Sequence, residues 1–133
     1  MNTRGTHLLA DLHGCDPQIL NDASRIEAAM RRAAHSAGCT ILHAQFHAFD
    51  PQGVTGLLLI AESHLSVHTW PEHSYAAVDL YTCGSAEPRQ AIEELAIALQ
   101  STRTDWLTVE RGRSESNPSL AISDSSPAHP KVV

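Results

Sequence analysis

The chain has 133 residues, a length typical of one domain. Its 15 acidic and 9 basic side chains give a formal net charge of −6, so it lacks the basic character with which proteins bind phosphate backbones. The longest apolar run, residues 57–61, is too short to cross a bilayer, and residues 1–5 lack the apolar segment of a secretion signal. Three cysteines, an odd number, are typical of reduced thiols. We therefore expect a single-domain cytoplasmic protein with neither a nucleic-acid nor a membrane partner.

Local patterns predict an alternation of strands and helices along the chain. Asp22 is a good N-cap and Gly38 a natural stop, and apolar residues recur between them at helical spacing, which predicts a helix over residues 23–37. Pro88 begins a second predicted helix over residues 88–99. Short apolar or alternating runs predict strands at residues 7–12, 40–49, 54–61, 74–82 and 106–110, with a turn at residues 51–53 that joins two of them into a hairpin.

This order of elements predicts an α/β (α+β) fold, a two-layer sandwich with two helices on one face of a mainly antiparallel sheet. Residues 56–61 are apolar on both faces of their strand, so the second face also needs a cover. We expect a second copy of the chain to provide it, which gives a homodimer with four layers in the order αββα. Residues 113–133 are rich in Ser and Pro and are expected to form a flexible tail after a folded domain over residues 1–112.

Reactive side chains are concentrated at residues 62–84, where we expect a site on loops held by the sheet. A metal site is one interpretation, although no C-x-x-C or H-E-x-x-H spacing supports it; the residues of suitable type are His64, His68, His73 and Cys83. A Cys–His nucleophile pair for acyl transfer is another, although no glycine-rich elbow surrounds Ser63 or Cys83.

The same segment can also be interpreted as having no catalytic or binding role. Trp70, Tyr75 and Val78 would then belong to the core, and the polar residues would form a solvated loop. That interpretation is preferred for four histidines, namely His7, His35, His73 and His129. Cys15 and Cys39 are expected to be packing residues.

Three segments in a consistent order resemble the short bacterial and archaeal S-adenosylmethionine decarboxylase proenzymes. They are HLLADLHGCDPQILND (residues 7–22), FHAFDPQGVTG (residues 46–56) and the block at residues 62–84. The resemblance implies a pyruvoyl enzyme that cleaves itself between Glu62 and Ser63 into a β chain, residues 1–62, and an α chain, residues 63–133. On this view Ser63 attacks the carbonyl of Glu62 to form an ester. His68 then accepts the α-proton of residue 63, and β-elimination cuts the chain.

The resemblance also implies the reaction: S-adenosylmethionine loses carbon dioxide to give the aminopropyl donor of spermidine and polyamine biosynthesis. Decarboxylation of an amino acid needs an electron sink, which the self-generated pyruvoyl ketone supplies through a Schiff base, so neither pyridoxal phosphate nor a metal is expected. Cys83 is implied as the proton donor to Cα, a task that suits a thiol that is mostly protonated at neutral pH.

Substrate contacts are implied in the same way. Phe49 and His68 are similar to the pair that flanks adenine, and Glu72 to the carboxylate that binds ribose, in a site that lies across a dimer interface. Thr55 stands where many relatives have Ser near the processing site, and His73-Ser74 where Tyr-Gly is common. Two alternatives remain: a pyruvoyl-dependent arginine or ornithine decarboxylase, for which Phe49 and Glu72 would have no use, and an uncleaved binding module on this fold.

Overall fold

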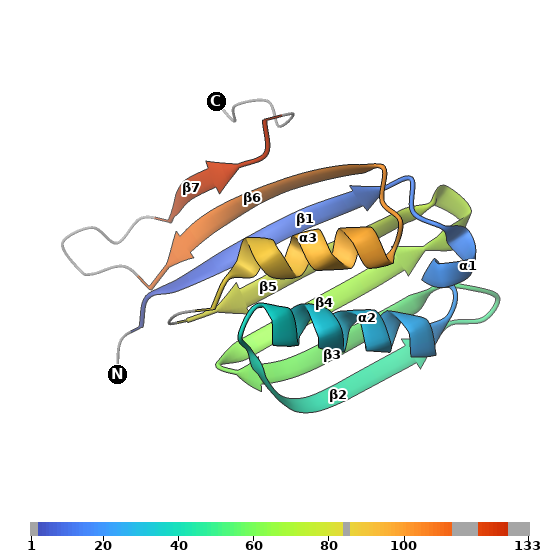
Figure 1. The fold of residues 1–133 in the computed structure, drawn as a ribbon, viewed down its shortest axis with the longest axis horizontal. Helices are drawn as coiled ribbons and strands as arrows, with labels where there is room; N and C mark the ends of the chain where they lie inside the picture. Colours follow the sequence, from blue (N-terminus) through green and yellow to red (C-terminus); the bar gives the residue numbers. More distant parts are fainter. Residues whose placement is uncertain (1–2, 84–85, 113–119, 128–133) are drawn as a thin grey trace.

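One antiparallel sheet with helices on a single face forms the molecule (Figure 1). The computed structural model describes residues 3–83, 86–112 and 120–127. In chain order the elements are β1 (Gly5–His13), α1 (Pro17–Leu20), α2 (Ala23–Ser36), β2 (Thr40–Ala48), β3 (Val54–Ala61), β4 (Ser63–Trp70), the 3-10 helix η1 (Pro71–His73), β5 (Tyr75–Thr82), α3 (Pro88–Ala98), β6 (Arg103–Arg111) and β7 (Ala121–Ser125). The seven strands pair in the order β2-β3-β4-β5-β1-β6-β7, and every pairing is antiparallel.

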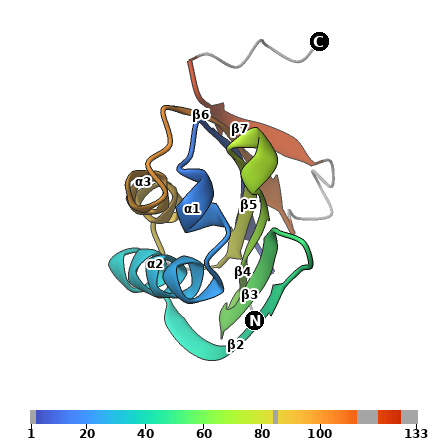
Figure 2. The same ribbon diagram turned by 90° about the vertical axis from the view of Figure 1, so that its right-hand side faces the viewer.

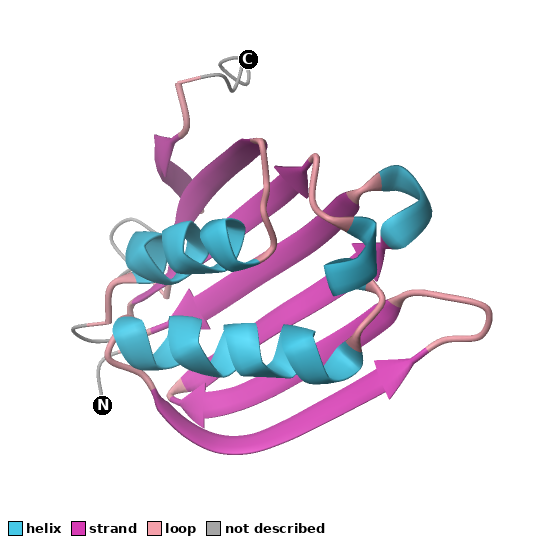
Figure 3. Ribbon diagram, turned by 45° about the vertical axis from the view of Figure 1, so that its right-hand side comes forward, coloured by secondary structure: helices cyan, strands magenta, loops and turns pink. Residues whose placement is uncertain are grey.

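Helices α2 and α3 lie side by side across the sheet (Figure 3). The Asp22 carboxylate accepts a hydrogen bond from the backbone N–H of Arg25 at 3.1 Å and so caps the start of α2. One stripe of α2 is buried against the sheet, made of Ile26, Ala29, Met30, Ala33 and Ala34. Both helices predicted from the sequence are confirmed, and the structure adds the short α1.

The two faces of the sheet differ in what covers them. Side chains that alternate along the central strands toward the helices form the core, among them Leu8, Leu12, Leu65, Val67 and Leu80. The opposite face, called the open face below, carries no helix among the described residues (Figure 2). Three leucines on it, Leu9, Leu57 and Leu59, are 42%, 42% and 47% exposed. The predicted two-layer fold is confirmed.

Two expectations about secondary structure were wrong. Residues 63–70 were expected in a connecting loop but form β4, a central strand in which Leu65, Val67 and Thr69 are buried. Part of the predicted flexible tail forms β7, which pairs with β6 and places Ile122 opposite Val109. Without β7, β6 would end the sheet with unpaired backbone groups, and pairing with β7 satisfies them.

Candidate active site

Ser63 lies at the tip of the β3–β4 hairpin. Ile60 and Ser63 are the last paired residues, and only Ala61 and the exposed Glu62 form the turn between them. The backbone φ of Ser63 is 121°, a conformation that residues with a Cβ rarely adopt. Strain of this kind is found at functional sites in proteins, and here it follows directly after the predicted scissile bond.

Cys83 lies at the same end of the sheet as Ser63. Ser63 pairs with Thr82 of β5, so Cys83 is the next residue along the strand that borders Ser63. Its side chain is partly exposed, whereas Cys15 and Cys39 are buried, as predicted for packing residues. Burial raises the pKa of the Cys15 thiol to about 11 and also raises that of Cys39. Of the three thiols, Cys83 is thus the one that solvent and ligands can reach.

A carboxylate on the open face gathers two histidines and a serine. Asp79 Oδ2 lies 2.7 Å from Nε2 of His7 and 2.8 Å from Nε2 of His64, while the hydroxyl of Ser66 donates to Asp79 Oδ1. Burial alone would raise the pKa of Asp79, but the hydrogen bonds from Ser66, His7 and His64, together with the charge of His64, lower it below its ordinary value. Asp79 is therefore an anion at neutral pH.

The second ring nitrogens of the two histidines meet different partners. Nδ1 of His7 lies 3.4 Å from a guanidinium nitrogen of Arg111, whose guanidinium also lies 4.6 Å from the centre of the Tyr81 ring. Nδ1 of His64 instead lies 3.4 Å from the hydroxyl of Ser63. His7, which was interpreted from the sequence as a histidine without a chemical role, thus takes part in this network through both ring nitrogens.

His68 lies on β4 but not beside Ser63. Its Nδ1 is 3.0 Å from the hydroxyl of Thr55 on the neighbouring strand β3. Five residues of strand separate His68 from Ser63, which corresponds to about 16 Å. The sequence suggested that Ser63, His68 and Cys83 meet at one edge of the sheet; a single chain brings together Ser63 and Cys83 but not His68.

The predicted substrate residues lie at the His68 end. Phe49 follows β2 and is 50% exposed, with its ring 4.6 Å from that of His47, and Glu72 is exposed on η1. Two hydrogen bonds hold the loop that contains Phe49. The Gly53 N–H donates to Asn21 Oδ1 at the end of α1 at 2.9 Å, and the Phe49 N–H donates to the Gly53 carbonyl within the loop at 2.8 Å. Ser63 and Trp70, the ends of β4, are about 23 Å apart at the usual rise of a strand.

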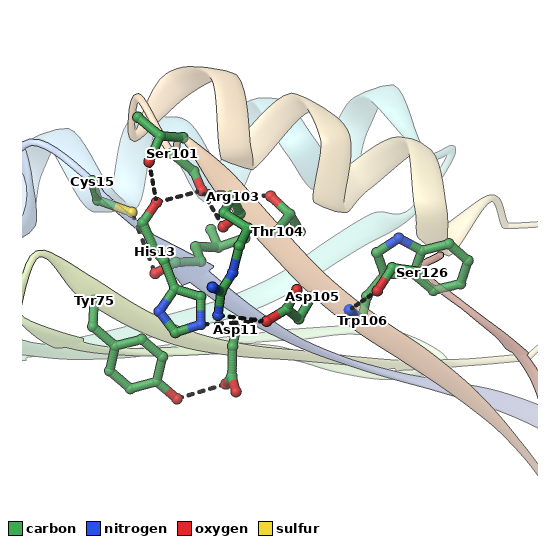
Figure 4. A network of polar contacts seen from close by, with 12 residues as sticks. Asp11, His13, Cys15, Tyr75, Ser101, Arg103, Thr104, Asp105, Trp106 and Ser126 are labelled. Carbon is green, nitrogen blue, oxygen red and sulfur yellow. Dashed lines mark hydrogen bonds and ion pairs between the residues drawn. The ribbon is translucent and has the colours of Figure 1, made fainter. Parts of the chain in front are cut away.

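A second polar cluster occupies the open face near these residues (Figure 4). The hydroxyl of Tyr75 donates to Asp11 at 2.6 Å, and the Tyr75 ring stacks between His13 and Trp70 with centroid distances of 5.3 Å to each. Burial, reinforced by the hydrogen bond and the charge of Asp11, raises the pKa of Tyr75 to about 12. The expectation of a core position holds for Val78 but not for Trp70, which is 41% exposed.

A shallow depression on the open face extends along β4 from Ser63 to His68. Its volume is about 540 Å³, and its lining includes Thr55, Leu57, Leu59, Ser63, His64 and His68. Among the described residues, the zinc ligands considered from the sequence do not form one cluster; the trio whose ligand atoms lie within 4.8 Å of one another is His7, His64 and Asp79. Because Asp79 Oδ2 already accepts both ring N–H groups, these three residues form a hydrogen-bonded unit.

Comparisons with known proteins agree with this fold. The structure is similar to the crystal structure of the adenosylmethionine decarboxylase from Aquifex aeolicus, with a TM-score of 0.78, 37% identity, and coverage of 90% of this chain and 99% of that one. The S-adenosylmethionine decarboxylase proenzyme of Thermotoga petrophila is 46% identical over 85% of this chain and 88% of its own length. That of Thermosipho africanus is 41% identical over 96% of each.

The fold and these relatives thus define the class of the protein, a small α+β decarboxylase. The family model for S-adenosylmethionine decarboxylase matches residues 6–112. The chain belongs to the S-adenosylmethionine decarboxylase family, a family of pyruvoyl-dependent enzymes made by self-cleavage of a proenzyme.

Proposed function

We propose that the chain is a proenzyme that cleaves itself between Glu62 and Ser63 and then decarboxylates S-adenosylmethionine. The observation that carries this proposal is the position of Ser63, in a strained conformation at a hairpin tip after an exposed Glu62. A hydroxyl at this position can attack the preceding carbonyl, and the exposed turn leaves the two new chain ends free to separate. The family match favours S-adenosylmethionine over arginine or ornithine as substrate.

The residues around Ser63 fit a pyruvoyl group formed from it. Ser63 borders the open depression, and Cys83 follows its strand partner Thr82. The group supplies a ketone for the substrate amine and an electron sink for decarboxylation. Cys83 holds the proton that returns to the substrate Cα, and Leu57 and Leu59 line the same depression as Ser63.

The site is completed by a second copy of the chain. His68 is about 16 Å from Ser63 along β4, too far for its imidazole to reach the α-proton of residue 63 in the same chain, and Phe49 and Glu72 lie beyond it. A two-fold arrangement that stacks two open faces with their strands reversed brings His68, Phe49 and Glu72 of one protomer over Ser63 and Cys83 of its partner. The exposed leucines of the open face would be buried in the same contact.

The homodimer therefore contains two composite sites in an αββα arrangement. In each site, Phe49 and His68 hold the adenine between aromatic faces, and Glu72 accepts hydrogen bonds from the ribose hydroxyls. The Thr55 hydroxyl orients His68 at 3.0 Å. The substrate carries a positive sulfonium, which aromatic faces attract.

Other features support a reducing compartment and small-molecule partners only. All three cysteines are free thiols, as expected in the cytoplasm. The net charge of −6 disfavours nucleic acid as a partner. None of the helices in the described residues is long and apolar enough to span a membrane.

Intact mass of the purified, denatured protein tests the self-cleavage. We expect two chains broken between Glu62 and Ser63, the second with the mass of a pyruvoyl rather than a serine terminus. Release of carbon dioxide from S-adenosylmethionine, compared with arginine and ornithine, then identifies the substrate. A single full-length mass after long incubation would favour the uncleaved binding module.

Co-expression of two inactive variants tests the composite site. Ser63→Ala retains His68 but cannot be cleaved, and His68→Gln retains Ser63 but lacks the histidine. Each variant alone should stay intact, whereas the mixed dimer should cleave its His68→Gln chain, because the partner supplies the missing imidazole. An intact His68→Gln chain in a mixed dimer isolated by two different affinity tags would contradict completion of the site by the partner.

A further inference from the structure

His64 connects the hydroxyl of Ser63 to the carboxylate of Asp79. Nδ1 of the imidazole lies 3.4 Å from Ser63 Oγ, and Nε2 lies 2.8 Å from Asp79 Oδ2. Hydroxyl, imidazole and carboxylate in this order are the arrangement that activates a serine nucleophile in proteins. The contact at Ser63 is long, as contacts in resting sites commonly are before the reacting groups approach.

We propose that His64 is the base that activates the Ser63 hydroxyl in the first step of self-cleavage, and that Asp79 positions it. The inference rests on the proposed self-cleavage and adds a residue to it. His68 remains the acceptor of the α-proton in the later elimination. The two steps thus use different histidines: His64 lies beside Ser63 in the same chain, and His68 is supplied by the second copy of the chain.

The hydrogen bonds of Asp79 determine which nitrogen of His64 carries the proton. Asp79 is an anion at neutral pH, since its hydrogen-bond donors outweigh the effect of burial and lower its pKa, so it accepts the Nε2–H of His64. In the neutral form of the ring, the lone pair is then on Nδ1, the atom that faces Ser63. The imidazole is therefore held in the tautomer that can accept the hydroxyl proton.

The proposed step is balanced in atoms and charge. The Ser63 Oγ–H proton moves to Nδ1 of His64 as Oγ bonds to the carbonyl carbon of Glu62. The bond between this carbon and the Ser63 nitrogen then breaks, and the nitrogen takes the proton back from the imidazolium. The product is an ester between Glu62 and the Ser63 side chain with a free amine, and Asp79 stabilises the imidazolium between the two transfers.

His7 provides a matched control for His64. Both imidazoles donate from Nε2 to the same Asp79 oxygen, at 2.7 Å and 2.8 Å, and both lie on the open face. Nδ1 of His7, however, faces Arg111 rather than Ser63. A role of these histidines in folding alone predicts similar effects of His7→Gln and His64→Gln, whereas a base at Ser63 predicts different ones.

The test measures the first-order rate of cleavage of the freshly purified proenzyme by intact mass. In His64→Gln the side-chain amide can keep the bond to Asp79 but offers no base to Ser63, so the rate should fall about 100-fold or more. In His7→Gln the cleavage rate should fall only about 5-fold, which is the effect of losing one hydrogen bond. Imidazole added to His64→Ala should restore cleavage, and Asp79→Glu should retain more activity than Asp79→Asn. Equal rates for the His7 and His64 variants, or no rescue by imidazole, would overturn the assignment.

Hydroxylamine separates the two steps, because it cleaves esters but not amides under mild conditions. His68→Gln should accumulate the ester and be cut by hydroxylamine at residue 63, whereas His64→Gln should form no ester and stay intact. Efficient hydroxylamine cleavage of His64→Gln would overturn the proposal while leaving self-cleavage in place. A wild-type chain that never cleaves would instead overturn the proposed function itself.

Discussion

The hydroxyl of Thr55 lies 3.0 Å from Nδ1 of His68, across the paired strands β3 and β4. Thr55 and His68 are opposite each other in the register, so the sheet itself sets this distance. Nε2 of His68 is left for the substrate or for a proton. A serine hydroxyl could make the same contact, so the hydroxyl rather than the methyl group of Thr55 is the part of the side chain that meets His68.

We therefore expect Thr55→Val to slow self-cleavage and Thr55→Ser to leave it nearly unchanged. Valine keeps the branched shape of threonine in the strand but removes the hydrogen bond to His68, worth about 1 kcal/mol or roughly 5-fold in rate. Rates of proenzyme conversion followed by gel electrophoresis would measure the effect. Equal rates for the Val and Ser variants would show that the hydroxyl does not orient His68.

Mutation of Cys83 should impair decarboxylation without preventing self-cleavage. Cys83→Ala should still yield two chains but should lose about 100-fold or more in kcat, because the proposed proton donor to the substrate Cα is missing. Alkylation provides an independent check: iodoacetamide should modify Cys83 in the native protein but not Cys15 or Cys39, which are buried and whose pKa values are raised. Modification of Cys15 before Cys83, read by peptide mass, would contradict the structure.

The sequence predicted the elements whose pattern is unambiguous. The α2 helix has a cap, a buried stripe and a glycine stop, and its predicted range differs from the observed one by a single residue. Strand β4 was missed although Leu65, Val67 and Thr69 alternate with outward polar residues, because the density of histidines there suggested a loop. The pattern of alternation was the better signal.

The Asp79 network could not be predicted, because it depends on strand register. His7 and Asp79 are 72 residues apart in the chain. His7 on β1 and His64 on β4 both pair with Tyr81 of β5, which makes them diagonal neighbours of Asp79 on the same face. The separation of Ser63 from His68 was also not predicted. The two residues are close in the sequence, which suggested that they are close in space, but the extended strand β4 holds them apart.

Glu72→Gln should raise the KM for S-adenosylmethionine more than it lowers kcat. The carboxylate is expected to bind the ribose away from the reacting carbon, and loss of a charged hydrogen bond costs about 1.5–3 kcal/mol, or roughly 10-fold to 100-fold in KM. Glu94→Gln, an exposed carboxylate on α3, is the control. An unchanged KM in the Glu72 variant would count against this residue as the ribose contact.

Replacement of Ser74 by glycine should stabilise the folded protein. It adopts a left-handed conformation with φ 50° and ψ 37°, which is costly for residues with a Cβ. Ser74→Gly should therefore raise the free energy of unfolding by about 1 kcal/mol, whereas Ser74→Ala should not. Urea denaturation in the Ser63→Ala background, at one protein concentration, keeps the chain uncleaved and the comparison valid. A destabilised glycine variant would contradict the assigned conformation.

Asp79 should contribute stability that disappears in acid. Its pKa is lowered in the folded protein by Ser66, His7 and His64, against the opposing effect of burial, so the unfolded chain binds a proton more readily. The contribution is complete above about pH 3.8, the ordinary value, and is lost as the pH falls from there through the folded pKa.

Asp79→Asn removes this dependence, because the amide does not titrate. In the Ser63→Ala background, the difference in unfolding free energy between Asp79 and the Asn variant should be largest near neutral pH and should narrow below about pH 3.8. Glu94→Gln, which lies away from the network, should leave the shape of the profile unchanged. Parallel profiles for Asp79 and its Asn variant over this range would show that the carboxylate gains nothing from its three donors.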